Sequence, residues 1–271
     1  MLATPSTPAQ RRSWIPKAES NALNVNTAGN SGFSPLVKIT LLTHTPEPVK
    51  TIYIACRTCY SKTPPSEMGD VPQEKMTKLI RHTMESGHHS VLEHVTFSFA
   101  VEGVSRALTH QLVRHRLASY AQQSQRYVTY EEGTLNFVTP KSIEATALKT
   151  YNAFMAESAR VYEELVASGV PAEDARYVLP NATVTQIVVT MNYRELIQFC
   201  RLRLCFRAQW EITEMTHLMK KEMIKVSRFL GNYLQPKCQH LGYCDETEPC
   251  GKYQFPPESS VVKAHRKELE L

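Results

Sequence analysis

Residues 94–101 alternate between apolar side chains and polar or small ones, and this alternation constrains the fold more than any other segment. Because neighbouring side chains of a β-strand point to opposite faces, strict alternation predicts a strand with one apolar face. The apolar positions are Val95, Phe97, Phe99 and Val101, and the intervening ones are Thr96, Ser98 and Ala100. This segment is the clearest strand in the sequence.

The remaining pattern mixes further strands with helices. Segments 37–42 and 183–191 are predicted strands, and segments 119–130 and 135–139 are predicted to be extended. Helices are predicted where apolar residues recur every three or four positions, at 46–60, 72–86, 105–114, 143–166, 193–205 and 210–233. Ser90 and Glu93 form a candidate capping box at the start of a further, short helix.

The order of these elements predicts the fold class. Strands and helices do not follow a strict β-α-β rhythm, and the sequence has no Gly-x-Gly-x-x-Gly loop. Both observations argue against a parallel sheet of the dinucleotide-binding type. The sequence therefore predicts an α+β fold with a mixed or antiparallel sheet that is flanked by long helices.

The chain has 271 residues, of which 42% are apolar, and this is enough for one large domain. We expect a flexible tail at 1–35, one domain at 36–235 and a cysteine-containing extension at 236–271. The tail lacks the apolar stretch of a secretory signal, and a transit peptide is the alternative to a plain tail. The sequence contains no run of about 18 apolar residues, so it predicts no membrane span. We therefore expect a cytoplasmic protein with no membrane partner.

Segment 114–127 reads RHRLASYAQQSQRY and contains three arginines and no acidic residue. An arginine guanidinium carries five N–H donors in a flat fork and binds phosphate by paired hydrogen bonds. The spacing of Arg114, Arg116 and Arg126 around Ser119 and Ser124 suits two separate anions, one on each side of a turn. The segment therefore indicates a site for small anionic ligands.

Two other interpretations of this segment remain open at this point. It can be a plain basic surface, although such surfaces are usually rich in lysine and this segment has none. It can also bind single-stranded nucleic acid, with Tyr120 and Tyr127 as stacking platforms between the arginines. The net charge of +5 is mild and suits anionic small molecules as well as nucleic acid.

The pattern Arg-His-Arg-x-x-Ser-x-x-x-x-Ser-x-Arg, which begins at Arg114 and ends at Arg126, resembles the signature of flavin-dependent thymidylate synthases. Further segments resemble parts of the same family. They are 87–94, 176–180, 192–196, and Arg203 followed by 208–211. The resemblance extends from residue 37 to residue 233 and so covers most of the chain.

The resemblance implies a reaction in which dUMP becomes dTMP. The carbon donor would be 5,10-methylenetetrahydrofolate, with FAD for hydride transfer and NADPH as the reductant. In such chemistry the cofactor reacts, and the protein binds, orients and tunes it. The resemblance also implies a homotetramer in which neighbouring chains share each active site, with small-molecule substrates and no nucleic-acid partner.

The resemblance further assigns a set of residues to dUMP. Its phosphate is expected to meet Ser124 and Arg126, with help from Arg176. The alternative for Arg176 is a local salt bridge to Glu173 or Asp174. The full expected dUMP set is Gln111, Arg114, Gln122, Gln123, Ser124, Gln125, Arg126, Arg176 and Arg203.

A second set is assigned to FAD by the same resemblance. It consists of His88, Ser90, Arg114, His115, Arg116, Gln122, Asn192, Arg194 and Gln198. Asn192 also precedes a predicted helix, where asparagine is a common N-cap residue, and both roles are open. His89, Gln122 and Gln198 differ from the residues that many members of the family have there, which weakens the expected contacts at these positions.

Arg203 is the expected catalytic residue. Uracil is a poor carbon nucleophile until negative charge is drawn onto its ring, and a guanidinium beside the pyrimidine stabilises the N3-deprotonated form. The alternative is that Arg203 belongs to an exposed helix end with Arg201 and Arg207. Ser124 has no adjacent base or orienting group, so we expect it to bind dUMP and not to act as a nucleophile.

The seven cysteines do not form the pattern of a secreted disulfide scaffold. Four of them lie in predicted helices and are expected in the core: Cys56, Cys59, Cys200 and Cys205. With His240, the C-terminal Cys238, Cys244 and Cys250 offer four zinc ligands, but their spacing matches no zinc pattern. We expect free thiols or a local disulfide there and no metal, and no cysteine is expected to act as a nucleophile.

Overall fold

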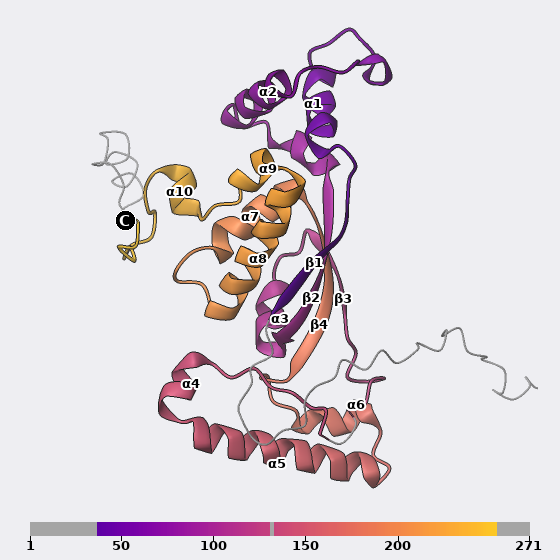
Figure 1. The fold of residues 1–271 in the computed structure, drawn as a ribbon, viewed down its shortest axis with the longest axis vertical. Coiled ribbons are helices and arrows are strands. Elements are labelled where there is room, and N and C mark those ends of the chain that lie inside the picture. Colours follow the sequence, from indigo (N-terminus) through magenta and orange to yellow (C-terminus); the bar gives the residue numbers. More distant parts are fainter. Residues whose placement is uncertain (1–36, 131–132, 254–271) are drawn as a thin grey trace, which may run out of the picture. The chain divides into compact units, whose positions relative to one another are not determined.

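The computed structural model describes residues 37–130 and 133–253, so the tail expected at 1–35 and the end of the C-terminal extension lie outside the described residues. Its centre is a four-stranded sheet (Figure 1). In sheet order the strands are β1 (Lys38–His44), β2 (Thr96–Ser105), β4 (Val184–Asn192) and β3 (Ala118–Gln122). All neighbouring strands are antiparallel. The α+β class is therefore confirmed, and within the described residues the sheet is antiparallel and not mixed.

The register of β2 and β4 places apolar side chains opposite one another on one face. The paired residues are Phe97 with Met191, Phe99 with Val189, and Val101 with Ile187, and all six are buried. On the other face the hydroxyl groups of Ser98 and Thr190 lie 2.8 Å apart in a hydrogen bond. The alternation predicted for residues 94–101 is thus confirmed, although the strand begins at Thr96 and continues to Ser105.

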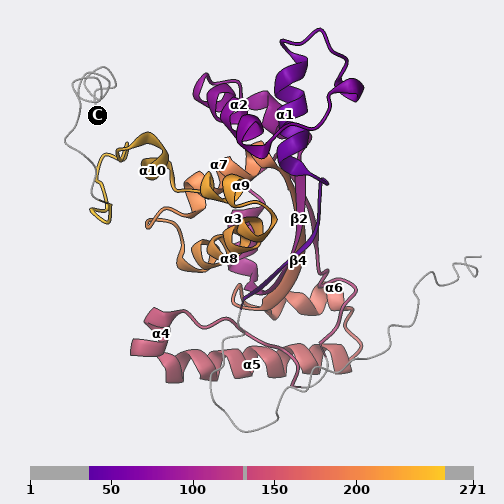
Figure 2. The same ribbon diagram turned by 45° about the horizontal axis from the view of Figure 1, so that its top comes forward.

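Two helices pack on the apolar face of the sheet, α7 (Tyr193–Arg203) and α8 (Trp210–Val226). Both lie on the same side of the strands in the two ribbon views (Figures 1 and 2). Helix α7 follows β4 directly and is capped by Asn192, whose side-chain oxygen accepts from the backbone N–H of Glu195 at 2.9 Å. This junction fixes where α7 starts and therefore where Arg203, its last residue, lies.

The single helix predicted at 210–233 is wrong, because the chain breaks at Ser227. Ser227 has φ −156° and ψ 113°, and its hydroxyl accepts from the backbone N–H of Leu230 to begin α9 (Arg228–Asn232). A Cβ on Gly231 would lie 2.5 Å from Cγ1 of Ile224. Helix α9 therefore turns back and packs closely on α8, a tertiary contact that apolar periodicity does not reveal.

The single helix predicted at 143–166 is also interrupted. It divides at Ala147, which has φ −144°, into α4 (Lys141–Thr146) and α5 (Leu148–Ala167). The short helices α6 (Ala172–Ala175) and η3 (Arg176–Val178) follow. Only the start of the extended segment predicted at 119–130 is a strand, because β3 ends at Gln122 and a turn begins at Ser124, whose carbonyl accepts from the N–H of Val128 at 3.0 Å.

The N-terminal helices α1 (Pro48–Thr58) and α2 (Gln73–Glu85) pack against each other, and the polar break between them contains η1 (Pro65–Glu67). The capping box expected from Ser90 and Glu93 is wrong. The segment forms the 3-10 helix η2 (His89–His94) without a side-chain cap. The carboxylate of Glu93 instead pairs at 2.6 Å with Arg194, in the first turn of α7.

Helix α3 (Arg106–Leu112) is shorter than the predicted 105–114. Its N-cap is Ser105, whose hydroxyl accepts from the N–H of Leu108 at 3.0 Å. Arg114 consequently lies past the end of the helix. The last described helix is α10 (Lys237–Leu241), and no helix in the described ranges is long and apolar enough to cross a bilayer.

Two of the four cysteines expected in the core are not there. Cys56 and Cys200 are buried, as expected. Cys59 is exposed and Cys205 is half-buried, and both lie past the ends of the helices that were predicted to contain them, at Thr58 and Arg203.

Candidate functional site

Arg203 lies half-buried at the end of α7 and is hydrogen-bonded through each of its three guanidinium nitrogens. Its Nε donates to Nε2 of His115 at 3.1 Å. Its two terminal nitrogens donate to Gln111, one to the side-chain oxygen at 3.4 Å and one to the backbone carbonyl at 3.2 Å. The fold thus brings the predicted residues Gln111, His115 and Arg203 together from α3, the segment after it and α7. This arrangement excludes the alternative of Arg203 as a freely exposed helix-end arginine.

His115 is buried and connects Arg203 to Glu195. Its Nδ1 lies 3.1 Å from a carboxylate oxygen of Glu195. Burial, together with the nearby charge of Arg203, lowers the pKa of His115 to about 4. The imidazole is therefore neutral near pH 7, with Nδ1–H donating to Glu195 and Nε2 accepting from Arg203.

The surroundings of His115 fix its ring and its backbone. The ring of Phe199 meets it edge-on, with centroids 4.8 Å apart. The hydroxyl of Tyr120 lies 2.8 Å from the carbonyl oxygens of His115 and Leu112. Burial raises the pKa of Tyr120. Tyr120 is thus part of the internal packing, which opposes its expected alternative role as a platform for stacked bases.

Arg126 and Arg176 meet at one residue, Glu173. The Glu173 carboxylate accepts from Nε and a terminal nitrogen of Arg126 at 2.9 and 2.8 Å. The backbone carbonyl of Glu173 accepts from Nε of Arg176 at 3.0 Å. The local interaction considered for Arg176 therefore exists, but it goes to the backbone, and the Glu173 carboxylate pairs with the more distant Arg126.

Three glutamines and one serine precede Arg126 directly in the sequence. Gln122 donates from its amide nitrogen to the hydroxyls of Thr109 and Thr185, at 3.1 and 3.3 Å, which leaves its amide oxygen for other partners. The Gln123 backbone N–H donates to the carbonyl of Gln186 at 3.0 Å. The Ser124 hydroxyl accepts from the N–H of Arg126 at 3.2 Å. Gln125 is buried, and its amide nitrogen has no hydrogen-bond partner among the described residues.

A cavity of about 480 Å³ lies between η2 and the first turns of α7. Three of the residues predicted to bind FAD line it, Asn192, Arg194 and Gln198. The cavity is also lined by residues that were not predicted: Met84, His89, Leu92, Glu93, Leu117, Glu195, Ile197 and Arg201. Since Glu195 also binds His115, the cavity is connected to Arg203 through two hydrogen bonds.

Four other predicted residues are exposed, and the fold of the single chain does not bring them together with the residues above. They are His88, Ser90, Arg114 and Arg116. The fold brings in two acidic residues that the sequence did not assign to a ligand site, Glu195 and Glu173, of which Glu173 was named only as a possible local partner of Arg176. The signal for Glu195 was present, because it belongs to the segment 192–196 that resembles the family. Glu173 carries no such signal in the sequence.

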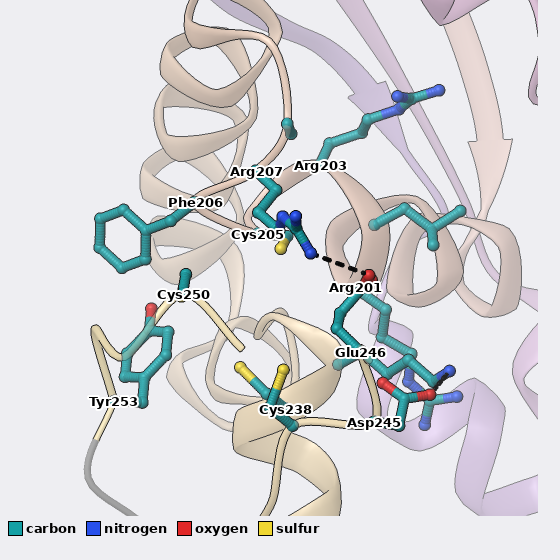
Figure 3. A pocket seen from close by; sticks show the side chains of 14 residues that line it. Arg201, Arg203, Cys205, Phe206, Arg207, Cys238, Asp245, Glu246, Cys250 and Tyr253 are labelled. Atoms are coloured by element: carbon teal, nitrogen blue, oxygen red, sulfur yellow. Dashed lines mark hydrogen bonds and ion pairs between the residues drawn. The ribbon is translucent and has the colours of Figure 1, made fainter. Parts of the chain in front are cut away.

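The half-buried Cys205 and the three C-terminal cysteines line a second cavity of about 280 Å³ at the end of α7 (Figure 3). The rings of Phe206 and Tyr253 pack across it at 5.5 Å between centroids. In Figure 3 the Arg203 side chain points away from the cysteines. In the ranges 37–130 and 133–253, no three His, Cys, Asp or Glu side chains are placed to hold one metal ion.

Comparison with known proteins identifies the family. Residues 40–227 match the model of the family described as "Thymidylate synthase complementing protein". The chain is 46% identical over 224 residues to the flavin-dependent thymidylate synthase of Geobacter sulfurreducens, covering 80% of this chain and 94% of the relative. It is 42% identical over 222 residues to the enzyme of the same name from Pyrococcus furiosus, covering 79% and 91%.

A solved structure has a similar fold. It is the UMP/dUMP methylase PolB from Streptomyces cacaoi bound with 5-Br dUMP, with a TM-score of 0.64 over 73% of this chain and 93% of that chain. The sequence identity is 21%, so this likeness concerns the fold alone. The family match and the two sequence relatives lead to one conclusion: the chain belongs to the family of flavin-dependent thymidylate synthases.

Proposed function

We propose that the protein methylates dUMP to dTMP, with 5,10-methylenetetrahydrofolate as carbon donor and with FAD and NADPH as the source of hydride. The family supports a flavin-dependent enzyme that transfers a one-carbon group. The observation that carries the proposal is the half-buried Arg203 guanidinium, which is hydrogen-bonded at all three nitrogens, by His115 of the motif that begins at Arg114 and by Gln111 just before it. A cation in this setting suits a reaction that draws negative charge onto a pyrimidine ring.

Arg203 is the proposed catalytic residue because of its charge and its limited exposure. Removal of the N3 proton makes uracil electron-rich and turns C5 into a carbon nucleophile. A guanidinium at the ring edge stabilises that form, and low solvent access strengthens the interaction. No serine or cysteine is assigned a covalent role, because the proposed chemistry needs no enzyme nucleophile.

The dUMP phosphate is proposed to bind at Ser124, Gln125, Arg126 and Arg176. Two arginines converge there on Glu173, and each retains N–H donors beyond those that Glu173 occupies. The buried amide nitrogen of Gln125 has no partner among the described residues and would be satisfied by a phosphate or uracil oxygen. Gln111, Arg114, Gln122 and Gln123 complete the proposed dUMP set.

FAD is proposed to bind at the cavity of about 480 Å³ between η2 and α7. The residues there fit the group, since Arg201 and Arg194, which is paired with Glu93, offer charge to a pyrophosphate while Asn192 and Gln198 offer amides to ribose or adenine. When bound, the flavin supplies the redox chemistry, and the chain supplies orientation and charge. Both ring nitrogens of His115 are already used inside the chain. Its backbone N–H donates to Leu112 and its carbonyl accepts from Tyr120, so its proposed flavin contact is through the second lone pair of that carbonyl. His88, Ser90, Arg114, Arg116 and Gln122 complete the set.

A homotetramer with shared active sites is part of the proposal. The exposed Arg114, Arg116, His88 and Ser90 support it, because a neighbouring copy can complete a site that these residues only begin. Large apolar side chains are also exposed, with Leu117 at 73% and Tyr177 at 84%. We further propose a cytoplasmic location and no nucleic-acid partner.

An anaerobic flavin cycle tests the proposal. The purified protein is expected to be yellow and to bleach with NADPH. It should then reoxidise when dUMP and methylenetetrahydrofolate are added together, with one dTMP formed per flavin. A colourless protein that binds polyuridine with a steep dependence on salt would instead support the nucleic-acid interpretation and contradict the enzyme.

A further inference from the structure

The Arg203 side chain is oriented by other side chains and not by its helix alone. Three hydrogen bonds hold it: Nε to His115, and the terminal nitrogens to the side chain and the backbone of Gln111. A guanidinium has five N–H donors in one plane. Three of the five are therefore engaged inside the chain, and one N–H on each terminal nitrogen has no hydrogen bond within the described residues. These two donors form the fork that is left for a ligand.

The bond from Nε depends on the tautomer of His115. Nε2 accepts a hydrogen bond only when the ring proton is on Nδ1. The Glu195 carboxylate, 3.1 Å from Nδ1, keeps the proton there. A carboxylate only accepts hydrogen bonds, so an unprotonated Nδ1 would place two acceptors opposite each other. In the other tautomer Nε2–H would point at the N–H of Arg203, and the guanidinium would have to turn away.

The ring of His115 has little freedom to move. It is buried, it packs edge-on against Phe199 at 4.8 Å, and its backbone carbonyl lies 2.8 Å from the hydroxyl of Tyr120. These contacts come from α7 and β3. The ring is thus held in one position, where it links Glu195 near the start of α7 to Arg203 at its end by hydrogen bonds.

We propose that His115 is a positioning residue for the reaction, which receives its tautomer from Glu195 and orients the Arg203 guanidinium toward the pyrimidine. This inference rests on the proposed function of Arg203. It differs from a flavin-binding role for the imidazole, because both ring nitrogens are used by protein partners. It predicts that the identity of the acceptor atom opposite Arg203 matters, and not only the volume of the side chain.

Two amide replacements separate the two ends of the imidazole. The carbonyl oxygen of glutamine reaches the position of Nε2 and can accept from Arg203, whereas the shorter asparagine reaches only the position of Nδ1. We expect His115→Gln to keep kcat within about tenfold of the wild type and His115→Asn to lower it by about 100-fold or more. The FAD content, the Tm and the KM for dUMP should be similar in the two variants. Equal kcat values for both variants would overturn the proposal.

Glu195 allows the same comparison one step further from Arg203. Glu195→Gln retains an oxygen that accepts from Nδ1–H. Glu195→Leu removes the acceptor, so the proton of His115 is no longer held on Nδ1. The leucine variant is therefore expected to lose about tenfold more kcat than the glutamine variant. If the leucine variant is at least as active as the glutamine variant, Glu195 does not act through the tautomer and the proposal fails.

A double-mutant cycle tests whether His115 acts through Arg203. Arg203→Lys keeps the positive charge but has no Nε–H for His115 to orient. On this background, His115→Asn should change the single-turnover rate of dTMP formation by less than about threefold. A further loss as large as that seen in the wild-type background would show that His115 acts independently of Arg203.

A spectroscopic measurement keeps the inference separate from the proposed function. The ¹⁵N shifts of labelled histidine in the FAD-loaded protein should show His115 with Nδ1 protonated and Nε2 as an acceptor. The Nε2 shift should change in Arg203→Lys, and the tautomer should change in Glu195→Leu. If the wild type makes no dTMP, the proposed function fails while these shifts still decide the hydrogen-bond chain. If the shifts show the other tautomer, the inference fails even in an active enzyme.

Discussion

The carboxylate of Glu211, at the start of α8, accepts two hydrogen bonds from Ser105, at the end of β2. One comes from the Ser105 backbone N–H and one from its hydroxyl, and both are 2.6 Å long. The same hydroxyl accepts from Leu108 and caps α3. Glu211 is 1% exposed. The segment 208–211, which resembles the family, therefore joins α3, which carries Gln111, to the helix that follows Arg203.

Glu211→Gln is expected to destabilise the protein by about 2 kcal/mol, because the new amide N–H₂ faces donors and leaves a buried group without its partner. Urea unfolding followed by circular dichroism measures this loss. Glu214→Gln, one turn later on an exposed position of the same helix, is the matched control and should change the free energy of unfolding by less than about 0.5 kcal/mol. Equal effects of the two replacements would contradict the role of Glu211.

Arg126→Ala is expected to weaken the binding of dUMP, because it removes a hydrogen bond to the phosphate. A hydrogen bond to a charged group contributes about 1.5–3 kcal/mol, so the KM for dUMP should rise by about 10- to 100-fold. Deoxyuridine, which lacks the phosphate, should be affected much less. Arg160→Ala removes an arginine of α5 that is paired with Glu157 and Glu164, and it should leave both values unchanged. A parallel loss for dUMP and deoxyuridine would place Arg126 away from the phosphate.

His115 is expected to make stability depend on pH in a defined window. Its pKa is lowered from 6.5 to about 4 in the folded protein by burial and by Arg203. Between these values the unfolded chain binds more protons than the folded one, so stability falls as the pH decreases from 6.5 to 4. The contribution is at most about 3 kcal/mol.

The comparison of the wild type with His115→Gln isolates this contribution to pH dependence. His217 and His240, whose pKa values burial also lowers, remain in both proteins and cancel in the difference. Urea unfolding at pH 7 and pH 4.5 should show a smaller loss of stability in the variant. The same pH dependence in both proteins would mean that folding does not lower the pKa of His115.

Replacement of any single cysteine by serine should leave kcat within about threefold of the wild type, because the proposed chemistry needs no protein nucleophile. Cys205, Cys238, Cys244 and Cys250 are the most informative, since they line the cavity at the end of α7. Initial rates of dTMP formation in reducing buffer give the result. A cysteine variant that binds dUMP and FAD normally but has no activity would contradict this mechanism.

The sequence predicted those parts of the fold that depend on local pattern. The alternation around Phe97 and Phe99 predicted β2 and its buried face, because side chains of a strand alternate between its two faces and eight residues are enough to show that pattern. The breaks at Ala147 and Ser227 were not predicted, since apolar periodicity continues through both. At Ser227 the break follows from a tertiary contact, the close packing of Gly231 on Ile224, which no local pattern contains.

The candidate site was predicted in its motif residues but not in their partners. Gln111, His115 and Arg203 were recognised through resemblance to a family, and the fold brings them together. The contacts of His115 with Glu195 and of Arg126 with Glu173 join residues 80 and 47 positions apart. Such pairings are set by the packing of α7 and α6 against the segment 114–127, and the spacing of charges along the chain does not encode them.

The release of tritium from [5-³H]dUMP tests the central claim most directly, because methylation at C5 must expel the hydrogen that C5 carries. The wild type should release tritium in proportion to dTMP, and only with NADPH and methylenetetrahydrofolate present. Arg203→Ala should retain FAD but lose at least about 100-fold in rate, whereas Arg207→Ala, in the exposed segment after α7, should behave as the wild type. Near-normal tritium release from a folded, FAD-loaded Arg203→Ala variant would contradict the account.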